Sequence, residues 1–147
     1  MRLQSQIKAY WLTFKGQLGI KTVIVGDSDK VNAAVLNDME YPLLWVMYPF
    51  EQGKNRNADV PKRRWKFEIL VLKHAKPDEE ERIAQNFDDT QIIGEAILQK
   101  LRDDSKADWG KTFEFDEIND TEMWQPKEQF GGDNCNGWLI PLSFLTA

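Results

Sequence analysis

The sequence predicts a single α+β domain over residues 1–147, with an N-terminal helix and a long helix packed on one face of a mostly antiparallel sheet. Two observations predict this class. Helical and strand-like apolar patterns follow one another in the order α-β-α-β-β-α-β-β-β, and no linker or repeat divides the chain. The length of 147 residues and the hydrophobic content of 41% suit one globular domain with a substantial core.

The chain is expected to begin with a helix over residues 2–15, because apolar residues recur there every third or fourth position. Gly16 and Gly19 then end the helix, and β-branched residues predict a short strand at 21–25. The helical stripe consists of Leu3, Ile7, Tyr10, Trp11, Phe14 and Leu18.

A second short helix is expected over residues 30–39, since side-chain oxygens just before it offer N-caps. Pro42 ends that region, and the apolar run at 43–48 predicts a strand buried on both faces because it does not alternate. Residues 50–63 are polar and contain Gly and Pro, so we expect a loop there.

The clearest strand pattern begins at Trp65, where apolar side chains alternate with Lys66 and Glu68. This strand is expected to pair with the one at 43–48. Pro77 and the acidic residues after it then predict a long helix over 79–103, because proline suits a first helical turn and acids favour the positive end of the helix dipole.

The last third of the sequence predicts β structure. Alternation at 113–117 indicates a short strand, a second short strand is expected at 121–124, and 131–137 is a turn by composition. The final strand is expected at 138–145. Because Pro141 lacks a ladder donor, this strand is expected to lie at a sheet edge or to carry a bulge.

Motifs for chemistry are weak in this sequence. The single cysteine, Cys135, excludes an internal disulfide, and it is placed in a turn with no histidine nearby. The single histidine, His74, has no evident catalytic partner. Residues 109–112 lack the earlier glycine of a phosphate loop, and 131–137 lack the glutamate of a calcium loop. We therefore expect no enzyme activity, no catalytic residue, no metal and no cofactor.

The net charge of −5 disfavours general binding to nucleic acid or anionic membranes, and no apolar run is long enough to span a bilayer. Without a signal peptide the chain is expected to stay in a reducing cytoplasm.

Charge is segregated along the chain. Residues 54–66 contain six basic residues and one acidic residue, whereas residues 103–147 contain three basic and ten acidic residues. Both regions are compatible with plain solvated surface. They also suit two different patches that meet between copies, because unlike patches build head-to-tail assemblies and opposite charges fix their register. The candidate interface residues are Lys54, Arg56, Lys62, Arg63 and Arg64 on one patch and Asp116, Glu117, Asp120 and Glu122 on the other.

Six tryptophans are many for this length. Trp11, Trp45 and Trp65 are interpreted as core residues. The other three, Trp109, Trp124 and Trp138, are expected at element margins, where they either pack against the sheet or anchor an interface.

A resemblance to a known family follows from the order of several segments. The N-terminal amphipathic helix leads to Tyr41–Trp45, then to a strand at 65–72 and to a long helix containing Thr90–Leu98, and the chain closes with a stretch from Gln129 to Phe144. In this order, over most of its length, the chain resembles the tail-completion, or tail-terminator, proteins of long-tailed bacteriophages and prophages.

The resemblance implies a structural, non-enzymatic subunit of the virion tail that is assembled in the host cytoplasm. Such proteins form a ring, commonly a hexamer, that stops tail-tube polymerisation and presents a surface to the head. The implied partners are further copies of the chain, the tail tube protein and a head-completion or connector protein, with transient DNA contact in the lumen and no membrane.

Two other functions stay open. A nucleic-acid-binding module would use the basic 54–66 loop, with Trp65 available for stacking on bases. An enzyme would require a pocket that joins two buried carboxylates, or one that joins His74 to an acid.

Overall fold

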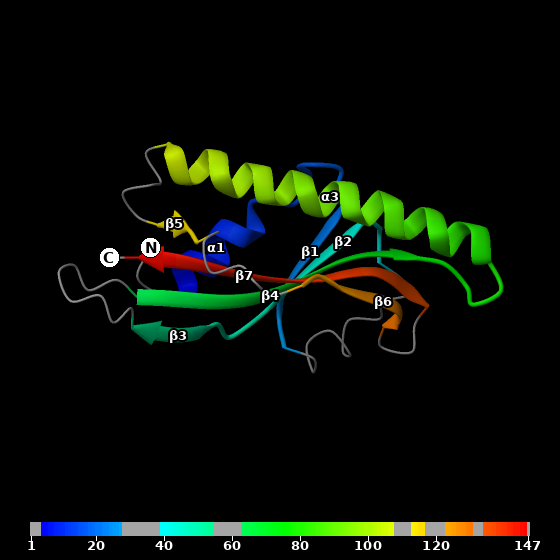
Figure 1. Ribbon diagram of the computed structural model, residues 1–147, viewed down its shortest axis with the longest axis horizontal. Helices are drawn as coiled ribbons and strands as arrows, with labels where there is room; N and C mark the ends of the chain where they lie inside the picture. The colour runs from blue at the N-terminus through cyan, green and yellow to red at the C-terminus, as the bar shows by residue number, and fades with distance from the viewer. Residues whose placement is uncertain are drawn as a thin grey trace.

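The computed structural model describes residues 4–27, 39–54, 63–107, 113–116, 123–130 and 134–146. Within these residues two helices lie against a seven-stranded, mostly antiparallel sheet (Figure 1). The predicted α+β class is confirmed.

The centre of the sheet is a pair of long antiparallel strands. β4 (Arg63–His74) and β7 (Cys135–Thr146) each contain twelve residues, and they pair along their whole length from Arg63↔Thr146 to His74↔Cys135. Figure 1 shows the two strands running side by side through the middle of the molecule. Every other strand is positioned by this pair.

The outer side of β4 is shared by two strands. β2 (Leu43–Met47) pairs with residues 69–72, and β3 (Glu51–Lys54) pairs with residues 63–66. β1 (Thr22–Gly26) extends the sheet beyond β2 in parallel register. The predicted pairing of the strands at 43–48 and 65–72 is confirmed.

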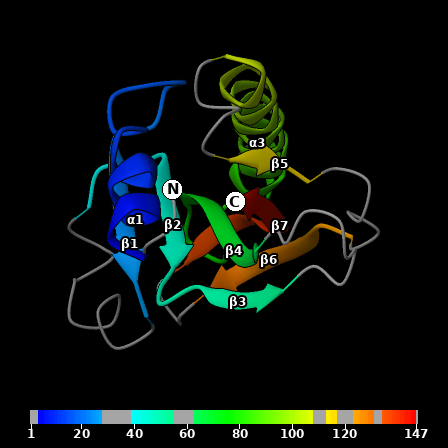
Figure 2. The ribbon, with the colours of Figure 1, turned by 90° about the vertical axis from the view of Figure 1, so that its left-hand side faces the viewer.

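The outer side of β7 is shared in the same way. β6 (Gln125–Phe130) pairs with β7 up to Leu139, and β5 (Glu114–Phe115) pairs with residues 144–145. Figure 2 shows β3 and β6 at the lower side of the sheet and β5 close to the long helix. The sheet therefore has a gap in pairing on each side of its central strands.

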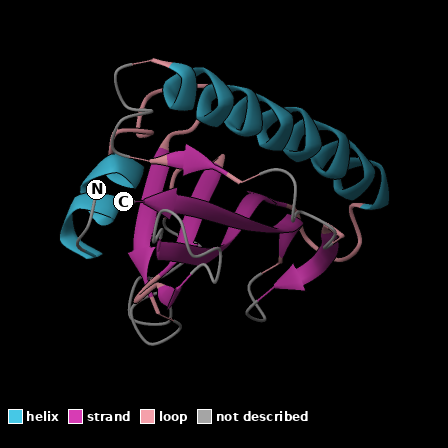
Figure 3. Ribbon diagram, turned by 60° about the vertical axis from the view of Figure 1, so that its left-hand side comes forward, coloured by secondary structure: helices cyan, strands magenta, loops and turns pink. Residues whose placement is uncertain are grey.

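Both helices cover the same face of the sheet, as predicted (Figure 3). Within the described residues α1 (Gln4–Leu12) ends three residues before the end expected for the helix at 2–15, and turns follow it in which Gly16 and Gly19 have φ of 80° and 79°. Glycine tolerates this left-handed conformation without a side-chain clash. α3 (Glu80–Lys106) agrees closely with the helix predicted at 79–103.

The start of α3 is fixed by Glu79. Its carboxylate accepts a hydrogen bond of 3.0 Å from the main-chain N–H of Lys76. That hydrogen bond, together with nearby Arg82, lowers the pKa of Glu79. An acidic residue here also faces the positive end of the helix dipole.

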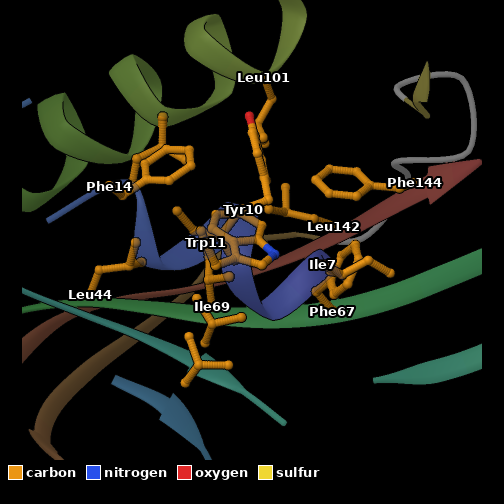
Figure 4. Packing of buried hydrophobic residues seen from close by; sticks show 14 of the residues in the cluster. Ile7, Tyr10, Trp11, Phe14, Leu44, Phe67, Ile69, Leu101, Leu142 and Phe144 are labelled. Carbon is orange, nitrogen blue, oxygen red and sulfur yellow. The ribbon is translucent and has the colours of Figure 1, made fainter. Parts of the chain in front are cut away.

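The core between the helices and the sheet is built from aromatic rings. Trp11 stacks on Phe144 with ring centroids 5.9 Å apart, and Phe144 lies 4.6 Å from both Phe67 and Phe113. All four side chains are buried. Figure 4 shows Trp11, Phe67 and Phe144 gathered between α1 and the central strands, with α3 above them.

A polar contact joins the two helices at the margin of this core. The Tyr10 hydroxyl donates a 2.6 Å hydrogen bond to Asp104, and Lys100 lies 3.0 Å from the same carboxylate oxygen. Burial, and then the hydrogen bond to Asp104, raise the pKa of Tyr10. The contact holds α1 against the C-terminal half of α3.

The helix-free face of the sheet carries a second apolar cluster at one end. It contains Ile24, Leu43, Trp45, Leu70, Leu72, Cys135 and Leu139. Alternate residues of β2 thus enter different cores, with Leu43 and Trp45 in this cluster and Leu44 and Val46 in the helix-covered one. The prediction that this strand is buried on both faces is confirmed.

The position of the last strand was predicted wrongly. Pro141 does not mark a sheet edge, because β7 lies between β4 and the pair β5 and β6. The Asp116 N–H donates to the Ser143 carbonyl, so the backbone groups of Ser143 face the outer side of β7. Because backbone groups of alternate residues in a strand face the same side, those of Pro141 face the outer side as well. Pairing with β6 ends at Leu139 and pairing with β5 begins at Phe144, so the missing N–H interrupts no ladder.

Three other expectations need correction or stay outside the described residues. The first part of the loop expected at 50–63 is strand β3. Of the strand expected at 121–124, residues 121 and 122 lie outside the described residues, and residues 123 and 124 precede strand β6, which begins at Gln125. Cys135 and Asn136 belong to β7 rather than to a turn. The helix expected at 30–39 falls almost wholly outside the described residues.

Candidate interaction surface

The predicted basic patch lies at one end of the sheet. Lys54 ends β3, and Arg63 and Arg64 begin the neighbouring β4, where Lys54 pairs with Arg63 in register. Arg63 is exposed and Arg64 is half-buried. The other two residues of this patch, Arg56 and Lys62, lie outside the described residues.

Of the four residues of the predicted acidic patch, only Asp116 lies within the described residues. Asp116 follows β5 directly and is buried, with a side chain that is 4% exposed. Glu117, Asp120 and Glu122 lie outside the described residues.

The structure brings one residue of each predicted patch together within a single chain. Arg64 Nη2 lies 3.2 Å from Asp116 Oδ2, and the Ser143 hydroxyl donates to the same oxygen at 3.3 Å. The contact arises because β4 and β5 flank the same stretch of β7, where Arg64 pairs with Leu145 and Leu145 with Glu114. At this pair the opposite charges are therefore neutralised inside one copy.

A pocket of about 400 Å³ opens beside this ion pair. Its charged and polar lining residues are Glu51, Arg64, Lys66, Glu68 and Ser143. Its apolar lining residues are Met47, Pro49, Phe67, Pro141 and Leu142. Half of these lining residues are charged or polar, whereas small-molecule sites are lined mostly by apolar side chains, so the pocket suits a charged or polar group.

The pocket lies where the sheet is interrupted. On the outer side of β4 the pairing with β2 ends at Ile69 and the pairing with β3 begins at Lys66. Glu68 is opposite Pro141, and the backbone groups of Pro141 point away from β4. The two residues therefore form a non-hydrogen-bonded pair, so the backbone groups of Glu68 point away from β7, to the outer side of β4. The pocket lies beside Phe67 and Glu68, the two β4 residues that fall between the β2 and β3 ladders.

The charges around the pocket are balanced except at one position. Arg64 is paired with Asp116, and Lys66 is directly opposite Glu51 in the β3–β4 register. Glu68 has no such cation, and its register partner is Pro141. Within the described part of the chain, the exposed side chains of Glu51, Lys66 and Glu68 form no hydrogen bond or ion pair.

Trp65 cannot serve as a stacking platform for nucleic acid. Its side chain is 2% exposed, and its indole N–H donates a 2.9 Å hydrogen bond to the Thr146 hydroxyl. It is a core residue, as are Trp11 and Trp45. The expectation that Trp65 is available to bases is wrong, because the side chain falls on the helix-covered face of β4.

Two of the three marginal tryptophans pack against the sheet. Trp124 and Trp138 have ring centroids 6.3 Å apart, and the indole N–H of Trp138 donates to the carbonyl of Phe87 on α3. Both are partly buried against the helix-covered core. Trp109 lies outside the described residues.

The single histidine and the single cysteine are neighbours in the sheet, contrary to the expectation from the sequence. His74 and Cys135 are register partners at the end of the β4–β7 pair. The Tyr41 hydroxyl lies 3.2 Å from the Cys135 sulfur, and its ring centroid lies 5.7 Å from that of His74. Cys135 is fully buried in the second apolar cluster, so the thiol is closed to substrate.

No cluster of three or more His, Cys, Asp or Glu side chains suited to a metal ion is found among the described residues. Neither described helix combines the length and the apolar character needed to cross a membrane. Comparison of the chain with known protein families, curated proteins and solved structures finds no match.

Proposed function

We propose that the chain is a structural, non-enzymatic subunit that assembles head-to-tail into a ring and caps a phage tail tube. In this role the ring, proposed to be a hexamer, ends tube growth and presents a surface for joining the head. Its partners would be further copies of the chain, the tail tube protein and a head-completion or connector protein. Its place would be the virion tail, after assembly in the host cytoplasm.

The observation that carries the proposal is the asymmetry of the sheet. One face is covered by both helices, whereas the Arg63 end of the other face has exposed charged side chains and the pocket. The adjoining strand β3 pairs only with β4 among the described strands, so its other edge has no strand partner within these residues. Open edges and exposed charged patches are surfaces through which chains associate.

Head-to-tail assembly requires two different patches on one copy. The pocket opens on the helix-free face, while α3 lies on the opposite face of the same sheet. A contact between unlike surfaces closes into a ring when the rotation between copies divides a full turn. The sequence resemblance to tail-terminator proteins and this geometry support the same kind of assembly.

The test is the assembly state of the full chain. We expect rings in negative-stain images and a multimeric mass by analytical ultracentrifugation, with association that weakens as salt screens the charges. Incubation with preformed tail tubes should place the protein at tube ends. A protein that stays monomeric at high concentration and low salt, and that also fails to bind tube ends, would overturn the proposal.

DNA is proposed to touch the ring only transiently, as it passes through the lumen. The isolated subunit should therefore show at most weak binding in a gel-shift assay at low salt. Strong binding that falls steeply with salt would instead identify a dedicated nucleic-acid binder.

A further inference from the structure

The pocket at the interruption of the sheet contains acceptors that its own chain leaves unused. Glu68 is exposed, and its side chain forms no hydrogen bond or ion pair among the described residues. Glu51 lines the same pocket and is exposed. The two carboxylates form a pair of acceptors beside apolar walls.

This set of acceptors suits a basic side chain with several donors. A guanidinium carries five N–H donors in one plane, so it can bind one carboxylate with two of them and reach a second carboxylate with a third. Its aliphatic stem can lie on apolar walls such as Pro49 and Pro141. The balance of charge favours a further cation, because around the pocket the three carboxylates of Asp116, Glu51 and Glu68 face only two cations, Arg64 and Lys66.

The described arginines differ in whether they already have partners. Arg64 pairs with Asp116, Arg82 with Glu79, and Arg102 contacts Gln99. Arg63 is exposed, and among the described arginines it alone has a side chain that forms no hydrogen bond or ion pair within the described part of the chain. Of these arginines it is therefore the one with a guanidinium available to another molecule.

Arg63 cannot reach the pocket of its own chain. It lies five residues from Glu68 on an extended strand, a separation of about 16 Å. Odd-numbered residues of β4 such as Trp65 and Phe67 belong to the helix-covered face, so Arg63 also leaves the strand on the opposite side from Glu68. A contact between Arg63 and the pocket must therefore join two copies.

We propose that Arg63 of one copy inserts into the pocket of the next copy, where its guanidinium binds Glu68 and Glu51. This inference rests on the proposed ring and names the pair of surfaces that closes it. The contact joins two unlike patches, as head-to-tail assembly requires. In this contact the acidic residues of the interface are Glu51 and Glu68, whereas Asp116 stays paired with Arg64 of its own chain.

The experiment measures self-association of charge-reversal variants of the full chain by sedimentation velocity over a concentration series. We expect Glu68→Arg and Arg63→Glu each to weaken association by about tenfold or more, as measured for close interfacial charge pairs. The double variant carrying both changes should recover association, because each copy again presents one acid and one base. Arg63→Lys should weaken association less than Arg63→Glu, since it keeps the charge and loses the planar donors.

Matched controls are available on the same molecule. Glu128→Arg reverses an exposed acid that does not line the pocket, and Lys127→Glu reverses a cation on β6. Both should leave association within about twofold of the wild type, which distinguishes a specific contact from an effect of net charge. Circular dichroism of each variant confirms that the fold is unchanged.

The outcomes separate this inference from the proposed function. If the wild type forms rings and the single reversals leave association unchanged, or if the double variant fails to recover, the Arg63 contact is wrong while the ring stands. If the wild type neither self-associates nor binds tube ends, both are wrong. Loss in both single variants with recovery in the double variant supports the contact.

Discussion

The two faces of the β4–β7 pair use alternate residues of the same strands for different purposes. Phe67 and Phe144 point into an aromatic core beneath the helices, whereas Lys66 and Ser143 on the opposite face line an open pocket. Neighbouring residues in the sequence thus experience opposite environments. At this end of the sheet the buried apolar contacts that stabilise the fold therefore lie on the helix-covered face, and the exposed charged groups lie on the other face.

The helix-free face is itself divided. Toward the His74 end it is closed by apolar side chains such as Leu70 and Leu72, and toward the Arg63 end it is charged. The charged end is thus the part of this face that is suited to binding.

The largest expected effect is at Phe144, where the aromatic rings converge. Phe144→Ala should lower the free energy of unfolding by about 3–5 kcal/mol, because it removes contacts with Trp11, Phe67 and Phe113 and leaves a cavity. Urea unfolding followed by fluorescence measures it. Leu145→Ala, the next residue on the opposite face, should cost clearly less, and equal costs would refute the contrast between faces.

Gly137 tests how tightly the two central strands approach each other. A methyl group added there would lie 1.8 Å from the carbonyl oxygen of Val71, so the β4–β7 ladder would have to shift. Gly137→Ala should lower the free energy of unfolding by about 2 kcal/mol or more. In Gly53→Ala the added carbon meets nothing within 4 Å, and a comparable loss in that control would contradict the explanation.

Asp116 tests the ion pair that neutralises the charged end. Asp116→Asn should cost about 1–3 kcal/mol in thermal or urea unfolding, because it leaves the half-buried Arg64 without its counter-charge and weakens the contact with Ser143. Glu128→Gln changes an exposed acid whose side chain forms no hydrogen bond or ion pair among the described residues, so it should change stability by less than about 0.5 kcal/mol. An unaffected Asp116→Asn variant would show that this pair is not structural.

The smallest effect is expected at the rim between α3 and β4. A hydrogen bond from Gln85 and the contact with Lys73 at 2.9 Å lower the pKa of Asp89 below its ordinary value of 3.8. The carboxylate therefore stabilises the fold above that pH, and this stabilisation disappears as the pH falls through the lowered pKa.

Asp89→Asn should accordingly be slightly less stable than the wild type at pH 7, by less than about 1 kcal/mol, because water still reaches about a third of each half-buried side chain of the pair. The difference should vanish in urea unfolding near pH 2. Asp88→Asn is the control, since Asp88 is exposed and forms no contact among the described residues. A difference that persists at low pH would assign the effect to something other than the charge.

The elements predicted best are those whose signal is local. The long helix was predicted within a few residues, because its apolar stripe and acidic start are contained in one stretch of chain. The alternation that begins at Trp65 likewise identified β4 and its buried face. Short strands such as β3 were missed, because Glu51–Lys54 carries no apolar pattern and is a strand only through pairing with β4.

The candidate site was predicted only in part for the same reason. The sequence indicates that Arg63 and Arg64 belong to a basic patch, yet it treats the two as equivalent. The fold makes them different, because Arg64 meets Asp116 across β7 while Arg63 stays exposed. The pocket could not be predicted, since it depends on where the pairing of β2 and of β3 with β4 stops.

The sequence by itself determined the α+β class, the two helices and the face that the aromatic residues of β4 bury, because periodicity is set by neighbours a few residues away. Only the tertiary structure decided which charges are neutralised, why Pro141 is tolerated in a central strand, and that His74 lies beside Cys135. These features depend on the register between strands that are distant in the chain, and side-chain patterns within one segment do not specify that register.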